Sequence, residues 1–292
     1  MTKGGFESKK RLIASIFLNL AITVSEASAG ILTGSLALVS DAGHNFSDVL
    51  SLILGYAGVS ISDKGPNERL TYGYKRAEVL TSLINASVLF IIGGYILFEA
   101  FSRFQTPIPV NPTWMVGVGS IALAGNIGSI FLLREGKDES LNLRTVLLHL
   151  IFDSLASVGV IVGGVLIFFY DAYIADVLIS ILIAIMIFVG ASRVLKEGVN
   201  IIMQGSPPGI DFDEVKNQIL EFEEVGSIHD LHIWSLSSKE NVLSCHICPS
   251  SREIENDEII RKIEKKLQEE QDIQHVTIQI ESEEICDTGD QF

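Results

Sequence analysis

The stretch Ser40-Asp41-Ala42-Gly43-His44-Asn45-Phe46-Ser47-Asp48 decides how the chain is interpreted, because it places ionisable residues inside a long apolar segment. His44 and Asp48 are four residues apart, so a helix carries them on one face, one turn from each other. The same spacing recurs at His149 and Asp153 in a second apolar segment. Two imidazoles and two carboxylates supply the four ligands of a tetrahedral zinc site. The pattern predicts a metal site between two membrane helices.

These four residues also have a purely structural interpretation, as a buried hydrogen-bonded network that ties two helices together. A charged side chain at the centre of a membrane helix costs at least ~2.5 kcal/mol on insertion scales, which favours a functional role. Asp41 lies three residues before His44, off the best register for a ligand. Two roles stay open for it: accepting a hydrogen bond from the ring of His44, behind the ligands, or bonding the helix backbone.

The composition indicates two parts of different character. Of the 292 residues, 48% are hydrophobic, and the mean hydropathy of +0.39 is too high for an ordinary soluble protein. The net charge of -15 is concentrated at residues 206–292, which hold 7 Lys and Arg against 21 Asp and Glu. We therefore expect a membrane domain at residues 1–205 and an acidic soluble domain at 206–292. The acidic balance argues against a nucleic-acid partner. The odd number of cysteines predicts no disulfide framework.

Six segments contain the roughly 20 mostly apolar residues that a helix needs to cross a lipid bilayer. They are Leu12–Leu32, Leu36–Ile61, Val79–Phe101, Trp114–Leu133, Val146–Tyr170 and Ile174–Val194. The connections on one side carry 13 Lys and Arg, and those on the other side carry only Arg103. Because basic residues stay on the cytoplasmic side, both termini are expected in the cytoplasm, with the spans in the inner or plasma membrane.

The periodicity changes after Pro207-Pro208. The pattern predicts helices at Asp211–Glu224 and Glu253–Glu270, and strands at Ser227–Leu236, Asn241–Cys248 and Ile273–Glu281. The order αββαβ predicts an α+β domain with a small open sheet backed by two helices. A free sheet face or edge favours pairing with a second copy of the chain. The expected fold is thus an all-α membrane domain of six transmembrane helices followed by this cytoplasmic domain.

Taken together, these features resemble the cation diffusion facilitator family, in its zinc-preferring branch. The resemblance covers nearly the whole chain and includes the six spans, the two His-x-x-x-Asp pairs and the αββαβ domain. Four motifs carry it: Ser35-Leu36-Ala37-Leu38 leading into Ser40–Asn45, Tyr72-Gly73-Tyr74-Lys75-Arg76-Ala77-Glu78, His149-Leu150-Ile151-Phe152-Asp153-Ser154, and Asp230-Leu231-His232-Ile233-Trp234-Ser235-Leu236.

The resemblance implies a homodimer in the lipid bilayer that exports divalent cations from the cytoplasm in exchange for protons. The family's transport-site positions fall on His44, Asp48, His149 and Asp153, and a His at the first position implies zinc. Zinc is then the transported ion, and no cofactor or enzyme activity is expected.

The resemblance also implies a regulatory zinc site in the C-terminal domain. The matching positions are His229, His232, His246, His275, Glu281 and Cys286. His229 and His232 face opposite ways on a regular strand, so at most one of them joins a given site, and a plain hydrogen-bonded role stays open for both.

The sequence Cys245-His246-Ile247-Cys248 looks like a zinc knuckle. On a strand, however, Cys245 and Cys248 point to opposite faces, so they cannot chelate one ion together. Cys245 is expected in the core, and His246 shares a face with Cys248.

Three alternatives remain at this point. The same antiporter could have cadmium, cobalt or iron as its main substrate. The spans could anchor a metal sensor whose acidic domain does the work. An intramembrane metalloenzyme would need a general base and an open metal position, and the chain has no His-Glu-x-x-His motif.

Overall fold

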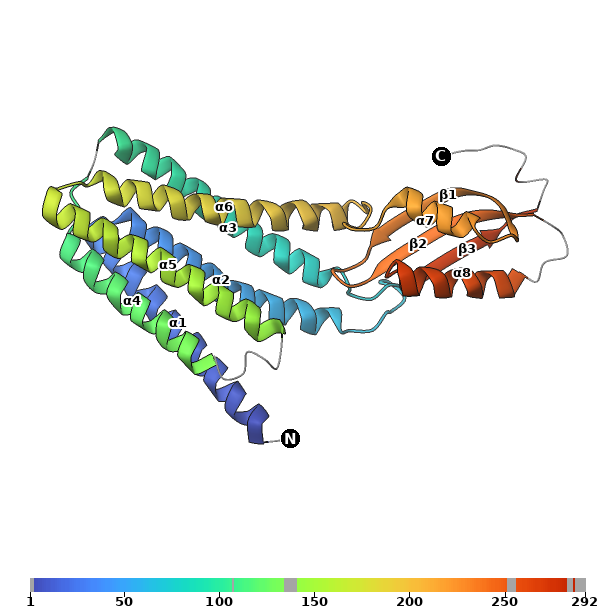
Figure 1. Cartoon of the computed structure of the whole chain (residues 1–292), viewed down its shortest axis with the longest axis horizontal. Helices are drawn as coiled ribbons and strands as arrows, with labels where there is room; N and C mark the ends of the chain where they lie inside the picture. Colours follow the sequence, from blue (N-terminus) through green and yellow to red (C-terminus); the bar gives the residue numbers. More distant parts are fainter. Residues whose placement is uncertain (1–2, 107, 134–140, 251–255, 283–285, 287–292) are drawn as a thin grey trace. The chain divides into compact units, whose positions relative to one another are not determined.

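The computed structural model describes residues 3–106, 108–133, 141–250, 256–282 and 286 (Figure 1). Its first six elements are long helices: α1 (Lys3–Thr33), α2 (Leu36–Ser62), α3 (Ala77–Gln105), α4 (Pro112–Leu133), α5 (Leu141–Tyr170) and α6 (Ile174–Ile202). Each of the six predicted spans lies within one of these helices. Residues 134–140 of the predicted fourth connection lie outside the described residues.

Four helices meet both the length and the hydropathy expected of a membrane span in the part of the chain that the structure describes. These apolar stretches are Ala77–Gln105, Pro112–Phe131, His149–Tyr170 and Ile174–Ile202. The apolar stretch of α1, Phe17–Thr33, is shorter. The helix α2 carries the polar sequence around His44, which lowers its hydropathy. The chain thus has a helical transmembrane domain, followed by a domain with a small sheet and helices.

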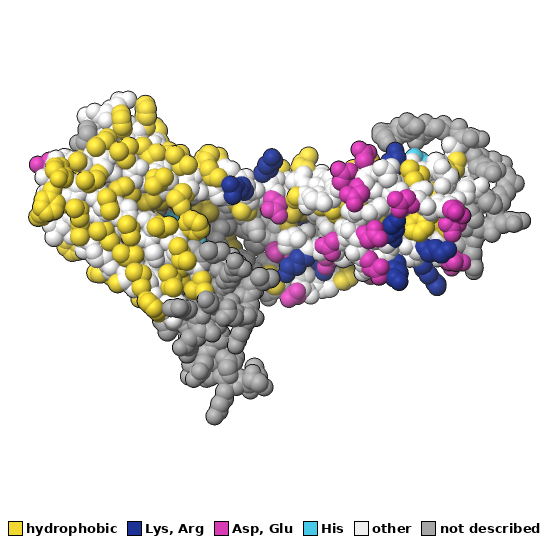
Figure 2. Space-filling model, in the orientation of Figure 1, with side chains coloured by type: hydrophobic (Ala, Val, Ile, Leu, Met, Phe, Trp, Pro, Cys, Tyr) yellow, Lys and Arg dark blue, Asp and Glu magenta, His cyan; other side chains and the backbone are white. Residues whose placement is uncertain are grey.

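Residues 1–54 and 84–194 form one compact unit, which we call the helical unit. In it α4 packs along α5 and α1, around buried side chains such as Leu38, Ile96 and Met115. Large apolar side chains also cover the outside: Ile91, Phe98 and Phe131 are each at least 65% exposed. Figure 2 shows hydrophobic side chains spread over much of the helical unit on the face drawn. Such a surface is typical of contact with lipid.

The start of α2 is held by a carboxylate from another helix of the same unit. Gly34 has a φ of +74°, a left-handed conformation that lets the chain turn sharply out of α1. The Asp176 carboxylate, near the start of α6, then accepts hydrogen bonds from Ser35 Oγ (2.6 Å), Leu36 N (2.8 Å) and Ala37 N (3.1 Å). These bonds satisfy backbone donors that a helix N-terminus otherwise leaves free. They fix where α2 begins, and therefore which of its residues share a face.

The second unit comprises residues 55–83 and 195–292. Its C-terminal part contains α7 (Phe212–Leu220), β1 (Val225–Ser235), β2 (Asn241–Pro249), α8 (Asn256–Glu270) and β3 (His275–Ile280). The order αββαβ is therefore as predicted. The helix expected at Asp211–Glu224 is shorter: Asp211 caps it through its side chain, and it ends at Leu220. Residues 253–255 of the helix predicted at Glu253–Glu270 lie outside the described residues.

The sheet has the strand order β1-β2-β3, with β2 antiparallel to β1 and parallel to β3. Side chains of α7 and α8, such as Ile219 and Ile263, share one hydrophobic core with Leu243 and Ile247 of β2. The pairing of β1 with β2 shifts register between His229 and His232. Asp230, inside that shift, has a φ of +50°. The irregularity re-aims the side chains on either side of it.

Candidate metal centres

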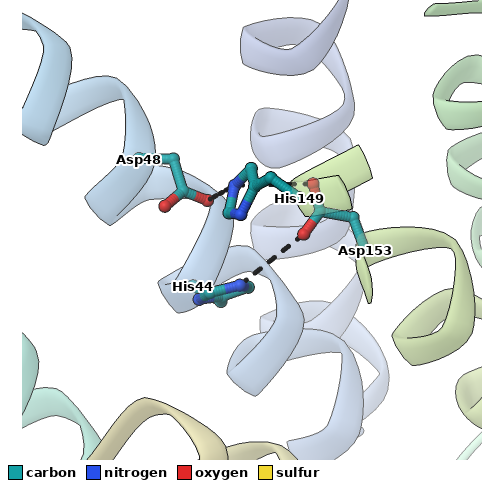
Figure 3. A group of neighbouring side chains, drawn as sticks. All are labelled: His44, Asp48, His149 and Asp153. Carbon is teal, nitrogen blue, oxygen red and sulfur yellow. Dashed lines mark ion pairs between the residues drawn. The ribbon is translucent and has the colours of Figure 1, made fainter. Parts of the chain in front are cut away.

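The four intramembrane residues predicted as ligands lie together. His44 and Asp48 come from α2, and His149 and Asp153 come from α5 (Figure 3). One ligand atom from each residue lies within 4.8 Å of the others. The four side chains thus converge on a single point between two helices of the helical unit.

The pairing within this group crosses between the helices. His149 Nε2 of α5 lies 3.0 Å from Asp48 Oδ2 of α2, and His44 Nε2 of α2 lies 3.6 Å from Asp153 Oδ1 of α5. The two imidazole rings meet edge to face, with centroids 5.6 Å apart. Asp153 is the most enclosed of the four, with its side chain 1% exposed, whereas His149 is 38% exposed.

Asp153 is the residue whose burial most needs an explanation. Neither of its carboxylate oxygens has a hydrogen-bond partner among the described residues. The nearest polar atoms are the two Nε2 atoms, at 3.6 and 3.7 Å. A buried carboxylate with no donor is costly unless a cation compensates it. The arrangement therefore suits a positive ion placed between the carboxylates and the imidazoles.

A second polar group lies behind α2, between α2 and α1. Asn45 Nδ2 donates a hydrogen bond to Glu26 Oε2 at 2.8 Å, and both residues are at most 1% exposed. Asn45 and Glu26 thus link α2 to α1 through a buried hydrogen bond. Asp41 is also 1% exposed. Its carboxyl group interacts with the carboxyl group of Glu26 and, electrostatically, with the imidazole of His44. Among the described residues no hydrogen bond joins Asp41 to the His44 ring, and Asp41 Oδ1 has no partner. The role of Asp41 behind the ligands stays a prediction.

The C-terminal domain contains a second group of metal-ligand side chains. His229 of β1 and His246 of β2 are directly opposite each other, and their ring centroids are 5.3 Å apart. The carboxylate of Glu281 reaches both: Oε1 lies 2.8 Å from His246 Nδ1, and Oε2 lies 3.1 Å from His229 Nε2. Glu281 is only 5% exposed. Two imidazoles and one buried carboxylate are a donor set that zinc accepts.

Two of the residues predicted for this site lie elsewhere. His232 sits beyond the register shift of β1, and its Nε2 pairs with Asp230 Oδ1 at 2.8 Å. His275, at the start of β3, is exposed and meets the ring of Tyr72 edge-on at 6.1 Å. Neither joins a metal-ligand group among the described residues. For both, a surface hydrogen-bonding or packing role is the better interpretation.

The sequence predicts no disulfide framework, and the structure contains one disulfide among the described residues. Cys248, on β2, and Cys286 are 38 residues apart in the sequence and are bonded through sulfur. Counting cysteines could not reveal this, because the pairing depends on how the chain folds after β3. Cys245 is 1% exposed within the core, as predicted, and burial raises the pKa of its thiol to about 12.

Sequence reasoning missed two residues that shape these sites. Asp176 caps α2 from the start of α6, and nothing in the local sequence marks it as a cap for a distant helix. Cys248 was considered only together with Cys245 and His246 of the same strand, and not as a neighbour of Cys286. It lies beside Glu281 and Cys286, with one ligand atom of each within 4.8 Å of the others.

Comparison with known proteins agrees with this architecture. Residues 12–203 match the family described as the cation efflux transmembrane domain, and residues 207–283 match the cation efflux protein cytoplasmic domain. The two matched ranges include every residue of both candidate metal centres, and Cys286 lies outside them.

Similar full-length proteins are transporters. The chain is 40% identical over 280 residues to the cadmium, cobalt and zinc/H(+)-K(+) antiporter of Bacillus subtilis, covering 94% of this chain and 90% of that protein. It is 35% identical to the metal cation efflux system protein CzcD of Cupriavidus metallidurans, covering 91% and 86%. It is 34% identical to the zinc transporter ZitB of Escherichia coli, covering 93% and 87%.

Among solved structures, the metal-bound C-terminal domain of the CzcD transporter is similar, with 39% identity, 25% of this chain and 99% of that chain covered, and a TM-score of 0.24. The family matches and the full-length relatives, set beside six long helices and an αββαβ domain, lead to one conclusion. The chain belongs to the cation diffusion facilitator family, whose members are transporters that carry metal cations out of cells.

Proposed function

We propose that this protein exchanges zinc for protons across the membrane, and that the zinc ion is held during transport by His44, Asp48, His149 and Asp153. The observation that carries the proposal is the convergence of these side chains from α2 and α5 on one point. Their donor set, two nitrogens and two oxygens, is one that zinc accepts in tetrahedral coordination.

Proton exchange follows from the chemistry of the same ligands. A metal binds only the deprotonated forms of imidazole and carboxylate, so zinc and protons compete for one site. Imidazole is the side chain whose proton equilibrium lies nearest neutral pH, so the two histidines are suited to carry the counter-ion. Exposing this site alternately to each side of the membrane would then couple zinc export to proton entry without a separate proton path.

The division of the chain supports a second part of the proposal. We propose that residues 1–205 carry out transport, and that residues 206–292 form a cytoplasmic domain that pairs two chains into a homodimer. The excess of Lys and Arg on one side of the spans supports a cytoplasmic location for both termini of a protein in the cell membrane.

Zinc is also proposed as a regulatory ligand in the cytoplasmic domain. His229, His246 and Glu281 already lie within bonding distance of one another, so an ion would need little rearrangement to bind. An ion at this position would lock β1, β2 and the end of β3 together. Titration calorimetry of a chain with the transport ligands removed should show zinc uptake that His246→Ala abolishes.

Cadmium and cobalt are the second candidate substrates, because the Bacillus subtilis relative is named as an antiporter of cadmium, cobalt and zinc. The donor set does not exclude cobalt, since nitrogen and oxygen ligands bind most divalent first-row metals. Cadmium is a softer ion with the same charge as zinc, and imidazole and carboxylate groups bind it as well.

The test is a flux assay on purified protein in lipid vesicles. A pH gradient is imposed, each metal is added in turn, and entry is followed with a metal-sensitive dye inside. We expect zinc flux that rises with the gradient and stops when a protonophore collapses it. Zinc flux unaffected by the protonophore would rule out proton exchange, and faster cadmium or cobalt flux would reassign the main substrate.

A further inference from the structure

Cys248 and Cys286 lie beside Glu281, at the edge of the imidazole group of the C-terminal domain. One atom from each of the three side chains lies within 4.8 Å of the others. Cys248 and Glu281 are 7% and 5% exposed, so this is a largely enclosed group of two sulfurs and a carboxylate. Such a donor set differs from both centres described above, neither of which contains sulfur.

The fold brings these residues together by backbone pairing. Glu281 N donates a hydrogen bond to Ile247 O at 3.0 Å, which holds the end of the third strand beside the residue that precedes Cys248. Cys286 N donates a hydrogen bond to Ser282 O at 3.1 Å. On the other side, Cys248 Sγ lies 4.0 Å from His229 Nδ1. A nitrogen donor is therefore available next to the two sulfurs.

The two sulfurs can exist in two states. They are bonded in this structure. The cytoplasm, where the proposed function places this domain, keeps thiols reduced. A reduced pair offers two thiolates, which are soft ligands that select zinc and softer cations over hard ones.

We propose that reduced Cys248 and Cys286, together with Glu281, form a sulfur-containing cation site, and that formation of their disulfide closes it. Only the placement of the domain in a reducing compartment rests on the proposed function. The ligand is a thiophilic cation such as zinc or cadmium, and the site senses both this cation and the redox state.

Closure needs an oxidant, which we take to be a low-molecular-weight disulfide. The thiolate of half-exposed Cys286 attacks one sulfur of that disulfide, forming a mixed disulfide and releasing one small thiolate. The thiolate of Cys248 then attacks the Cys286 sulfur, forming the internal bond and releasing the second small thiolate. The two cysteines lose two electrons, the small disulfide gains them, and the cation loses both of its sulfur ligands.

The third cysteine provides a matched control within the same strand. Cys245 points into the core, where burial raises its thiol pKa to about 12, so it forms no thiolate near neutral pH. Replacing it by Ala should leave the sulfur site intact.

The experiment uses the full-length protein in detergent, reduced with a phosphine that is then removed. Cadmium is added, and the ultraviolet charge-transfer absorption of cadmium–thiolate bonds is recorded. Imidazole and carboxylate ligands do not produce this band. We expect it in the wild type and in Cys245→Ala, and we expect its loss in Cys286→Ser and Cys248→Ser. After treatment with glutathione disulfide, the band should vanish, and the thiols titrated after denaturation should fall from the three cysteines of the sequence to one.

Several results would overturn the proposal. These are no band in the reduced wild type, an undiminished band in Cys286→Ser, or three titratable thiols after oxidation. Cys286 is the less buried of the pair, so its variant tests the site even where Cys248→Ser fails to fold. The transport ligands contain no sulfur, so Asp153→Asn should lose transport but keep the cadmium–thiolate band. This variant therefore separates failure of the sulfur site from failure of the transport site.

Discussion

His149 Nε2 lies 3.0 Å from Asp48 Oδ2, so the imidazole of one helix meets the carboxylate of the other. The second pair, His44 with Asp153, crosses in the same way. The closest contact of each imidazole is therefore with the carboxylate of the other helix, although His149 Nε2 also lies 3.7 Å from Asp153 Oδ2 within α5. The complete centre exists only while α2 and α5 stay in register. A change that slides one helix against the other would separate both pairs at once.

Removing the buried carboxylate should abolish transport. We expect Asp153→Asn to reduce zinc flux by at least about tenfold. Replacing a residue that hydrogen-bonds to a metal ligand typically lowers metal affinity or activity roughly 10–100-fold, and replacing a ligand itself should lower it no less. Flux into vesicles measures the effect. Asp63→Ala, an exposed carboxylate on the connection after α2, is the matched control. Wild-type zinc flux in Asp153→Asn would contradict the assignment of the site.

Exchanging the first imidazole for a carboxylate should change the preferred metal. His44→Asp replaces a nitrogen donor by a harder oxygen donor, which suits manganese better than zinc. We expect the ratio of zinc flux to manganese flux to fall by about tenfold, or ~1.4 kcal/mol. His232→Asp, which makes the same exchange outside both centres, should leave the ratio unchanged. An unaltered ratio in His44→Asp would show that position 44 does not select the metal.

The buried amide between α1 and α2 should matter for stability. Asn45→Ala removes the hydrogen bond that Asn45 Nδ2 donates to the buried carboxylate of Glu26, and a buried group that loses its partner costs about 1–3 kcal/mol. Denaturant unfolding in detergent measures the loss. Asn85→Ala is the comparison, since Asn85 bonds Ser51 at an exposed position. Equal losses in unfolding free energy for the two variants would mean that burial of the Asn45–Glu26 hydrogen bond adds nothing to stability.

The thiol of Cys245 should report on unfolding of the C-terminal domain. Its folded pKa is about 12, against about 8.5 for a free cysteine, because burial disfavours the thiolate. A raised pKa stabilises the fold below pH ~8.5, and this contribution is lost as pH rises further, since only the unfolded chain then releases the proton.

In the oxidised protein at pH 8, an alkylating reagent should therefore label Cys245 slowly, and rapidly after denaturation. Mass spectrometry of the labelled peptide gives both rates. Rapid labelling of the native protein would show that Cys245 is not enclosed.

The intramembrane centre could be predicted from sequence because its geometry is local. A helix fixes the spacing of His44 and Asp48, and that of His149 and Asp153, without reference to the rest of the fold. Only the meeting of α2 with α5 is a tertiary event, and membrane insertion, which penalises isolated charges, leaves few other arrangements for the four residues.

The C-terminal domain was less predictable because its ligands depend on strand irregularities and on a turn after the last strand. A regular strand would have left His229 and His232 equivalent, but the register shift at Asp230 separates them. The bond between Cys248 and Cys286 joins positions 38 residues apart, and the sequence has no periodic signal for such a pairing. The end of α6 was also missed, because a helix can continue beyond its apolar stretch: α6 continues past Val194 to Ile202 through polar residues.

The capping of α2 by Asp176 has a mechanical consequence. Three hydrogen bonds anchor the first turn of α2 to the start of α6, so this end behaves as a pivot. His44 lies eight residues further along, about 12 Å at 1.5 Å per residue. A small tilt of α2 about the anchored end would therefore displace Asp48 more than His44, and would open one side of the proposed ion site before the other.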